Sequence, residues 1–378
     1  MRGQGRLEVV LTGGGTGGHI EPALALARAL ERSGRERAAL HFVGARRGME
    51  GKAIGDAGFS ISLLPGRGVR RRLAWSNVPA LCGLALALLE ACALLLRHRP
   101  RVVVTFGGYA GLPSSLAAVL LRIPLLVVNL DAIPGGANRL VARFAARTAM
   151  AFPAPLPRGV LTGAPLREAV LAAAAEEPSA ARARLELPEG RAVLVVVGGS
   201  LGAGRLNEAA LGLARRFAAR DDLVLVHVCG ARNYDEVAAE RDALGIATGG
   251  GAGLDYRLLA FAAELPELFR AAALVVSRAG AMTVAELAAI GAPSLLVPLP
   301  NAPGDHQRRN TAELVRAGGA LVVDDAEVTA EHLEALLGPL LAEPGRLEEM
   351  ARAARSVGRL DATSRVVALI DELAKAAA

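Results

Sequence analysis

Residues 7–19, Leu7-Glu8-Val9-Val10-Leu11-Thr12-Gly13-Gly14-Gly15-Thr16-Gly17-Gly18-His19, join a short apolar run to a glycine-rich stretch. Apolar residues then recur at helical spacing from Pro22 to Leu30, which predicts a strand, a turn and a helix. A turn with so few Cβ atoms can take positive φ angles and bring backbone N–H groups close to an anion. It is not a Walker A loop, because no Lys-Ser/Thr pair follows. A purely structural turn is the alternative.

The same strand–turn–helix pattern recurs along the whole chain. Runs rich in Val and Leu alternate with helical stretches, which is typical of parallel sheets covered on both faces. The expected strands lie near residues 7–12, 38–43, 60–64, 101–105, 124–129, 147–152, 191–197, 222–228, 256–261, 273–277, 293–297 and 320–323. With 378 residues, this predicts an α/β fold of two doubly wound, Rossmann-like parallel-sheet domains facing a cleft. The proline-rich stretch 153–157 marks the junction, giving domains at 1–162 and 163–345.

Charge is distributed unevenly between the two halves. Residues 1–162 contain 21 Lys/Arg against 8 Asp/Glu, a net charge of +13, whereas residues 163–378 contain 22 against 29, a net charge of −7. The first half is therefore expected to meet an anionic surface. With three Tyr and one Trp in the chain, nucleic acid is not an expected partner, and a lipid surface or phosphorylated substrate fits better.

Residues 78–96 form a long apolar stretch with arginines on both sides. Arg67, Arg70, Arg71 and Arg72 precede it, Arg97, Arg99 and Arg101 follow it, and Trp75 would suit a membrane interface. Pro79, Gly83 and Glu90 argue against a helix that spans the bilayer. A buried helix and a helix that docks on an anionic leaflet remain the two main interpretations.

The cysteines indicate a reducing compartment. Cys82, Cys92 and Cys229 offer neither a disulfide framework nor metal-ligand spacing. No signal peptide is recognised, and the first residues lead directly into a strand. We therefore expect a cytoplasmic protein. No metal or other cofactor is expected, because no cluster of potential ligands has metal-binding spacing.

Three expected strand ends in the first half carry glycine-rich or polar turns, at residues 13–19, 106–111 and 129–135. The carboxyl ends of parallel strands meet at one edge of a sheet, so these turns are expected to form one wall of a ligand site. Asp131 is the only acidic residue in them. It is a candidate catalytic residue or a turn cap.

The second half repeats this design. The turn 198–203, with Ser200, can hold a diphosphate on backbone N–H groups. In the stretch 278–286, Arg278 could neutralise a leaving diphosphate, and Glu286 could accept hydrogen bonds from a ribose diol or be an exposed helix residue. The stretch 305–310 could bind sugar hydroxyls or be a polar helix start.

These motifs, in this order, resemble the MurG family of glycosyltransferases over nearly the full length. They are GGGTGGH at 13–19, FGGY at 106–109, GGSLGA at 198–203, RAGAMTVAE at 278–286 and DHQ..N at 305–310. The resemblance implies a GT-B architecture, with residues 346–378 packing back on the N-terminal domain. It also implies inverting transfer of N-acetylglucosamine from UDP-N-acetylglucosamine to the 4-hydroxyl of a lipid-linked muramyl-pentapeptide. The family acts in peptidoglycan synthesis as a peripheral protein of the cytoplasmic membrane face.

The resemblance assigns roles by position. Ser200 and Arg167 would contact the donor phosphates, Glu286 the ribose, the backbone at Ala262 the uracil, and His306 and Gln307 the sugar hydroxyls. The other residues expected to contact substrate are Thr16, Gly17, Gly18, Tyr109, Asn129, Arg278, Ala281, Met282 and Thr283.

Two residues are candidates for the general base. Val128-Asn129-Leu130-Asp131 stands where the family usually has His-Glu-Gln-Asn, and Asp131 could replace the missing carboxylate. His19 and Asp131 are therefore rival bases, with His19 ranked first. Alternatives are a different lipid or small-molecule acceptor, a hydrolysing or epimerising enzyme, and a nucleotide-sugar-binding protein without turnover. A dinucleotide-dependent oxidoreductase ranks last, because Gly44-Ala45-Arg46-Arg47 stands where an acidic ribose clamp is needed.

Overall fold

The computed structural model describes residues 7–14, 17–46, 50–65, 78–199, 203–249 and 253–377. Arg67, Arg70, Arg71, Arg72 and Trp75 lie outside these ranges. The chain divides into two compact units, residues 1–167 with 360–378 and residues 168–359. The sequence places the boundaries at 162/163 and 345/346. The segment 346–378 is divided between the units: residues 346–359 belong to the second unit and residues 360–378 to the first.

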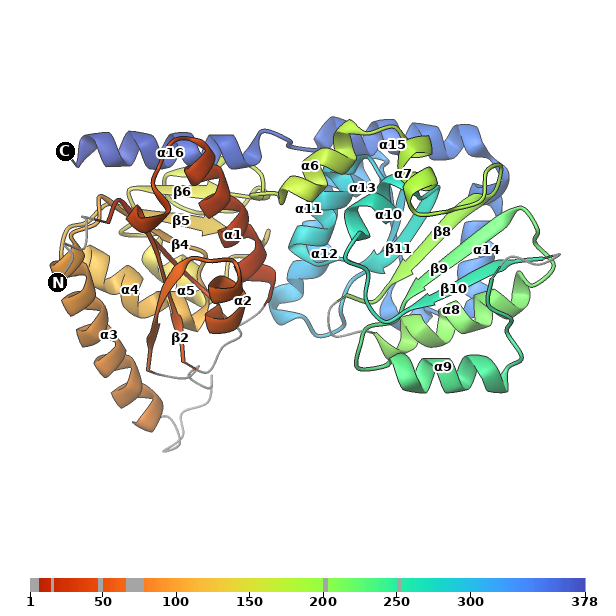
Figure 1. Ribbon diagram of the computed structural model, residues 1–378, viewed down its shortest axis with the longest axis horizontal. Helices are drawn as coiled ribbons and strands as arrows, with labels where there is room; N and C mark the ends of the chain where they lie inside the picture. Colours follow the sequence, from red (N-terminus) through yellow and green to blue (C-terminus); the bar gives the residue numbers. More distant parts are fainter. Residues whose placement is uncertain are drawn as a thin grey trace. The chain divides into compact units, whose positions relative to one another are not determined.

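A seven-stranded parallel sheet organises the first unit (Figure 1), in the order β3-β2-β1-β4-β5-β6-β7. The strands are β1 (Val9–Thr12), β2 (Leu40–Ala45), β3 (Ser60–Leu64), β4 (Val102–Thr105), β5 (Leu125–Asn129), β6 (Arg147–Met150) and β7 (Gly159–Leu161). Its main helices are α1 (Gly17–Arg32), α2 (Glu50–Asp56), α3 (Val78–His98), α4 (Gly108–Leu120), α5 (Gly136–Val141) and α16 (Ala362–Ala376).

The core of the first unit forms where small helix residues meet β-branched strand residues. Val10, Val103 and Val127 pack in one cluster with Ala87 and Ala91 of α3. Alanines four residues apart on α3 allow α3 and α4 to approach closely, and these two helices are in contact. α16 packs against α1, although the two helices lie at opposite ends of the sequence (Figure 1).

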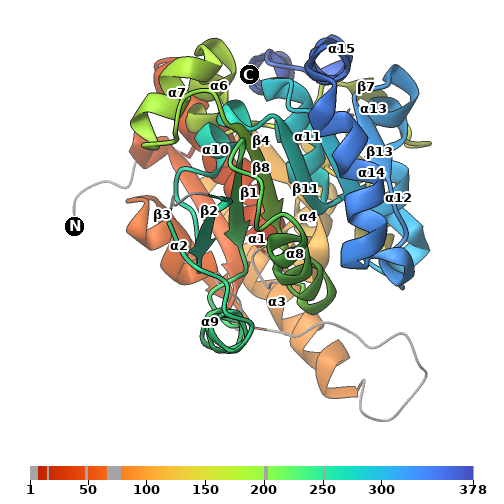
Figure 2. The same cartoon turned by 90° about the vertical axis from the view of Figure 1, so that its right-hand side faces the viewer.

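A six-stranded parallel sheet organises the second unit, in the order β10-β9-β8-β11-β12-β13. The strands are β8 (Ala192–Val197), β9 (Leu223–Val228), β10 (Asp255–Leu259), β11 (Leu274–Arg278), β12 (Ser294–Val297) and β13 (Ala320–Val322). The helices are α6 (Glu168–Ala175), α7 (Pro178–Arg184), α8 (Gly204–Arg216), α9 (Tyr234–Ala243), α10 (Leu265–Ala271), α11 (Ala281–Ile290), α12 (His306–Asn310), α13 (Ala312–Ala317), α14 (Ala330–Ala342) and α15 (Pro344–Val357). α8 and α14 pack side by side over one face (Figure 2).

Each sheet has a topological switch point. The strand order reverses between β1 and β4 in the first unit and between β8 and β11 in the second. Because crossovers between parallel strands are right-handed, the helices that follow the two strands at a switch point lie on opposite faces of the sheet. This leaves a crevice at the carboxyl ends of those strands, which is where open α/β sheets bind ligands.

The α/β architecture and all twelve expected strands are confirmed, with end shifts of a few residues. The strand β7 was missed. It has three residues and pairs only with β6, at the edge of the sheet. It follows the proline-rich stretch 153–157, which predicts a linker. A strand this short carries no periodic signal of its own, and its pairing with β6 is a tertiary contact.

Candidate active site

Two glycine-rich turns lie side by side at the switch point of the first sheet. They follow β1 and β4, whose ends are joined by a hydrogen bond from Phe106 N to Thr12 O of 2.8 Å. Gly108 has a φ of +75°, and a Cβ on it would overlap the carbonyl oxygen of Gly14. A larger residue at Gly108 would therefore push the turns apart and strain the backbone. The expected convergence of these two turns is confirmed.

Glu50 is a buried carboxylate beside the first turn that the sequence analysis missed. It is the first residue of α2 and is 0% exposed. A Cβ on Gly14 would overlap its Oε1 atom, and a Cβ on Gly44 would lie 3.1 Å from its Cβ atom. The sequence feature that could have indicated this buried side chain is the pair Gly14 and Gly44, near the ends of β1 and β2. Two residues without a Cβ leave room there for one larger side chain.

His19 lies half-buried in the first turn of α1. Burial lowers the pKa of its imidazole, and the carboxylates of Asp131 and Glu50 offset part of that shift. The ring is therefore neutral near pH 7 and able to accept a proton. The same two carboxylates would then stabilise the imidazolium. Tyr109, in the first turn of α4, has a pKa raised by burial and by the charge of Glu50.

Asn129 connects the third turn to the second. Its Nδ2 donates to Asp131 O at 2.6 Å, and its Oδ1 accepts from Asn138 Nδ2 at 3.1 Å. A Cβ on Gly107 would overlap Asn138 Oδ1, so Asn138 lies directly against the glycine-rich turn that follows β4. Asn129 is 1% exposed. Its side chain holds the turn that carries Asp131 in place.

The remaining predicted residues of the first unit lie at helix and unit ends. Gly17 and Gly18 begin α1, so their backbone N–H groups lie at its positive end. Arg167 is half-buried and is the last residue before the second unit. Thr16 lies outside the described residues, as does Ser200 in the second unit.

In the second unit, helix starts flank the switch point between β8 and β11. α11 begins directly after the turn at Gly280, and this N-cap residue makes no side-chain hydrogen bond to the helix start. Ala281, Met282 and Thr283 form its first turn, which can therefore bind an anion through the backbone. Glu286, one turn further along, is 6% exposed. Its carboxylate is thus part of the packed structure beside this turn, in contrast to an exposed helix residue.

Arg278, at the end of β11, already has an anionic partner. Its Nη1 lies 2.6 Å from Asp325 Oδ1, and both side chains are 13% exposed. Nη1 also donates to the carbonyl oxygens of Val297 and Pro298 at 3.5 Å. In this structure the charge of Arg278 is therefore balanced within the protein. The first turn of α11 is a nearby positive element whose N-cap residue, Gly280, supplies no capping side chain.

The stretch 305–310 closes the same edge of the sheet. His306 Nδ1 donates to Pro303 O at 3.1 Å, and Gln307 Oε1 accepts from Leu299 N at 2.8 Å. Asn310 Nδ2 donates to Ala279 O at 3.5 Å, which ties α12 to the turn before α11. Ala262 is buried just after β10, beside the exposed Phe261. Donor-site candidates thus gather at the carboxyl ends of β10, β11 and β12.

Potential metal ligands do not cluster in the described ranges. There, no three side chains of His, Cys, Asp or Glu are grouped so that they could hold a metal ion.

The helix α3 has one buried and one exposed apolar face. Ala87, Ala91 and Leu95 are buried, whereas Leu86, Leu89 and Leu96 are 49%, 68% and 56% exposed. Within the described ranges, no helix has the length and apolarity needed to cross a bilayer. The two interpretations, core helix and docking helix, are compatible, because they use different faces of α3.

Two doubly wound parallel sheets are the architecture of the GT-B class of glycosyltransferases. Residues 9–150 match the glycosyltransferase family 28 N-terminal domain, and residues 193–366 match the glycosyltransferase family 28 C-terminal domain.

Three relatives narrow this class to one family. The chain is 36% identical over 375 residues to the UDP-N-acetylglucosamine–N-acetylmuramyl-(pentapeptide) pyrophosphoryl-undecaprenol N-acetylglucosamine transferase of Desulforudis audaxviator, covering 97% of this chain and 99% of that protein. It is 38% identical to the enzyme of the same name from Pseudomonas savastanoi pv. phaseolicola, covering 97% and 98%. The crystal structure of Acinetobacter baumannii MurG superposes with a TM-score of 0.78 at 30% identity, covering 97% and 99%. The chain belongs to the MurG family.

Proposed function

We propose that this chain transfers N-acetylglucosamine from UDP-N-acetylglucosamine to the 4-hydroxyl of the muramyl residue of undecaprenyl-pyrophosphoryl-MurNAc-pentapeptide, converting lipid I to lipid II in peptidoglycan synthesis. The near full-length similarity to enzymes named for this reaction supports it. The observation that carries the chemistry is the neutral His19 beside the carboxylates of Asp131 and Glu50, at the switch point of the first sheet.

The reaction is a single displacement with inversion at the anomeric carbon. The acceptor oxygen forms a bond to that carbon while the bond from the carbon to the donor's β-phosphate oxygen breaks. The electron pair of the broken bond leaves with UDP, and the proton of the acceptor hydroxyl moves to His19. Burial keeps His19 free of a proton beforehand, and Asp131 and Glu50 stabilise the charge that it gains.

The donor is assigned to the carboxyl edge of the second sheet. Backbone N–H groups at the start of α11 would bind the diphosphate together with Ser200 and Arg167, while Glu286 holds the ribose. Gln307 and His306 would contact the sugar from α12. The uncapped start of α11 supports this assignment, since the charge of Arg278 is balanced by Asp325.

Membrane association is assigned to α3. Leu86, Leu89 and Leu96 present an apolar face, and Arg97 and Arg99 follow at its end. Leucines flanked by arginines favour the interface of an anionic leaflet, in which the helix lies without crossing. This supports peripheral association with the cytoplasmic face of the cell membrane, where a lipid-linked acceptor would be reached.

The test is transfer of labelled N-acetylglucosamine from its UDP donor to a short-chain analogue of the undecaprenyl-pyrophosphoryl muramyl-pentapeptide, with EDTA present. We expect labelled disaccharide product at a rate that EDTA does not change. If UDP binds but no product forms, the acceptor assignment is wrong. The search would then turn to other lipid-linked or small-molecule hydroxyls, as the altered turn at 128–131 would allow.

A further inference from the structure

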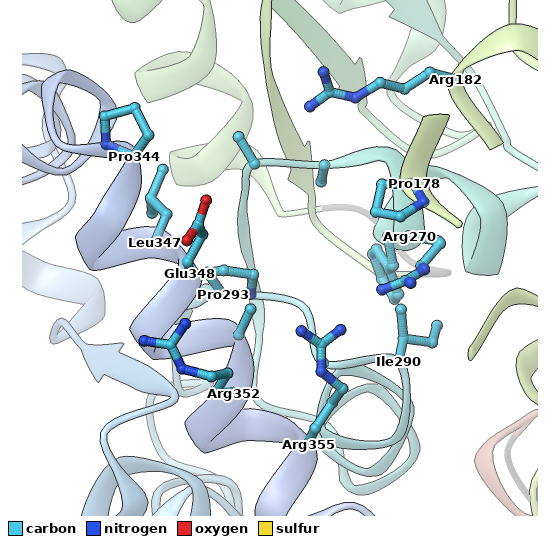
Figure 3. Close-up of a pocket in the computed structure, with 15 residues that line it drawn as sticks. Pro178, Arg182, Arg270, Ile290, Pro293, Pro344, Leu347, Glu348, Arg352 and Arg355 are labelled. Carbon is cyan, nitrogen blue, oxygen red and sulfur yellow. The ribbon is translucent and has the colours of Figure 1, made fainter. Parts of the chain in front are cut away.

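A pocket of about 600 Å³ lies in the second unit, at the edge of the sheet opposite the donor site (Figure 3). Ala272 and Ala273 lie in its wall and directly precede β11, and Pro293 lies there and directly precedes β12. The pocket is therefore at the amino ends of these strands. Its other walls come from α7, the ends of α10 and α11, and α15. None of the described residues assigned to the proposed reaction lines it.

Four arginines surround this pocket. Arg182 comes from α7, Arg270 from α10, and Arg352 and Arg355 from α15, and Figure 3 shows their guanidinium groups on different sides of the hollow. In the part of the chain that the structure describes, none of the four lies in an ion pair. Among the described residues that line the pocket, Glu348 is the one with an acidic side chain. This grouping occurs in the half of the sequence whose net charge is −7.

The two half-buried arginines are held in place by backbone carbonyls. Arg270 Nε donates to Glu176 O at 2.5 Å, and Arg182 Nε donates to Ala271 O at 3.0 Å. The side chains are thus fixed by their Nε atoms, and the Nη groups of Arg270 form no hydrogen bond within the described chain. Fixed guanidinium groups lose little conformational freedom when they bind an anion.

The positive charges in the pocket are poorly compensated. Burial lowers the pKa of Arg270, and the neighbouring charge of Arg355 lowers it further, while Glu176 and Glu177 offset only part of this. Burial also lowers the pKa of Arg182. An anion placed between these groups would relieve the repulsion and replace lost hydration.

We propose that this pocket is a second ligand site, which binds a small molecule carrying phosphate groups. Guanidinium groups match phosphate oxygens in pairs of parallel hydrogen bonds, and the volume falls within the range of roughly 300–1,000 Å³ typical of small-molecule sites. Apolar side chains of Ile290, Pro293 and Leu347 supply a wall for the rest of the ligand. The proposal is independent of the transfer reaction, since it uses none of its residues.

The test uses isothermal titration of the full chain at low salt with inorganic pyrophosphate, and separately with monomeric dihexanoyl phosphatidic acid. The variant is the double substitution Arg352→Gln, Arg355→Gln. Both arginines are exposed, and Gln at 355 keeps the Cγ and Cδ atoms that lie nearest to Gly291. The control is Arg346→Gln, also exposed on α15 but outside the pocket.

We expect each arginine removed to weaken pyrophosphate binding by about tenfold, so the double variant should bind about a hundredfold more weakly. The affinity of Arg346→Gln for pyrophosphate should equal that of the wild type. Affinity for UDP-N-acetylglucosamine should stay within twofold of the wild-type value in both. Weaker binding of phosphatidic acid alone would support the site with a lipid headgroup as its ligand. If neither probe binds more weakly to the double variant, the proposal is wrong, and any pyrophosphate bound belongs to the donor site.

Discussion

At the scale of single residues, the proposed chemistry depends on how two carboxylates influence the pKa of one imidazole. Burial lowers the pKa of His19, and Asp131 and Glu50 raise it again in part. A base that is neutral before the reaction and stabilised after it can take the proton with a small change in solvation. Glu50 acts through His19 and is therefore a positioning and electrostatic residue in this scheme.

The first residue-scale prediction separates the two candidate bases. His19→Ala should lower kcat by about 10²–10⁴-fold, while Asp131→Asn should lower it less, because the amide keeps the shape of the turn. The measurement is steady-state transfer, with UDP affinity as the check on folding. If Asp131→Asn abolishes turnover and His19→Ala retains much of it, Asp131 is the base.

The second residue-scale prediction concerns Glu50→Gln, which keeps size and removes charge. Without that charge the pKa of His19 falls further. Since His19 must be neutral to act, activity would persist to lower pH. We expect the acid limb of the kcat/KM profile to move toward lower pH, with a reduced plateau. Glu21→Gln, an exposed residue of α1, is the control. An unchanged acid limb would contradict the role of Glu50.

At the scale of elements, α3 has two different faces, one in the core and one that we propose meets the membrane. Its alanines pack against the sheet and α4, whereas three leucines remain exposed. Exposed leucines contribute nothing to the core, so their replacement should leave the free energy of unfolding nearly unchanged. Burying each in a lipid interface would contribute roughly 1–2 kcal/mol.

We predict that the double substitution Leu86→Ser, Leu89→Ser weakens binding to anionic vesicles by at least about tenfold. Transfer to a water-soluble acceptor analogue should be retained. The measurement is vesicle co-sedimentation, and the control is Leu360→Ser, another exposed leucine of the first unit. Equal binding by the variant and the wild type would remove α3 from the membrane contact.

At the scale of the whole molecule, each sheet contains a histidine that folding keeps neutral. Burial lowers the pKa of His227 to about 4, and burial with the charge of His98 lowers the pKa of His41 to about 4. His227 Nδ1 accepts from the Tyr256 hydroxyl at 2.8 Å, and Nε2 donates to Asn207 Oδ1 at 3.1 Å. Protonation would disturb this fully bonded arrangement.

In the unfolded chain these histidines gain a proton near pH 6.5. In the folded chain they gain it only near pH 4. The unfolded state therefore binds more protons in this window, and stability falls as pH decreases through it. We predict a loss of up to about 1.4 kcal/mol per pH unit per histidine. Urea unfolding at several pH values measures it. His227→Gln should flatten the dependence, and the exposed His332→Gln should not.

Much of the fold could be predicted from local sequence patterns. Short apolar runs rich in Val and Leu identified the strands, and glycines after several of them identified the turns, because short runs bounded by turn residues are typical of buried parallel strands. The C-terminal segment shows what local patterns leave open. The family resemblance implies that residues 346–378 pack back on the N-terminal domain, and only the tertiary contacts assign α15 to the second unit and α16 to the first, where α16 contacts α1.

The sequence alone determined the two-sheet architecture and the glycine-rich turns, since both follow from residues close together in the chain, and the family resemblance added His19 as a candidate base. The tertiary structure alone decided which distant groups act on them. In the folded chain Glu50 lies against Gly14, and the charge of Arg278 is balanced by Asp325. The amide oxygen and nitrogen of Asn129 both form hydrogen bonds that hold the turn at Asp131. Burial and pairing depend on contacts between residues far apart in sequence, and these contacts set the charges on which the proposed catalysis depends.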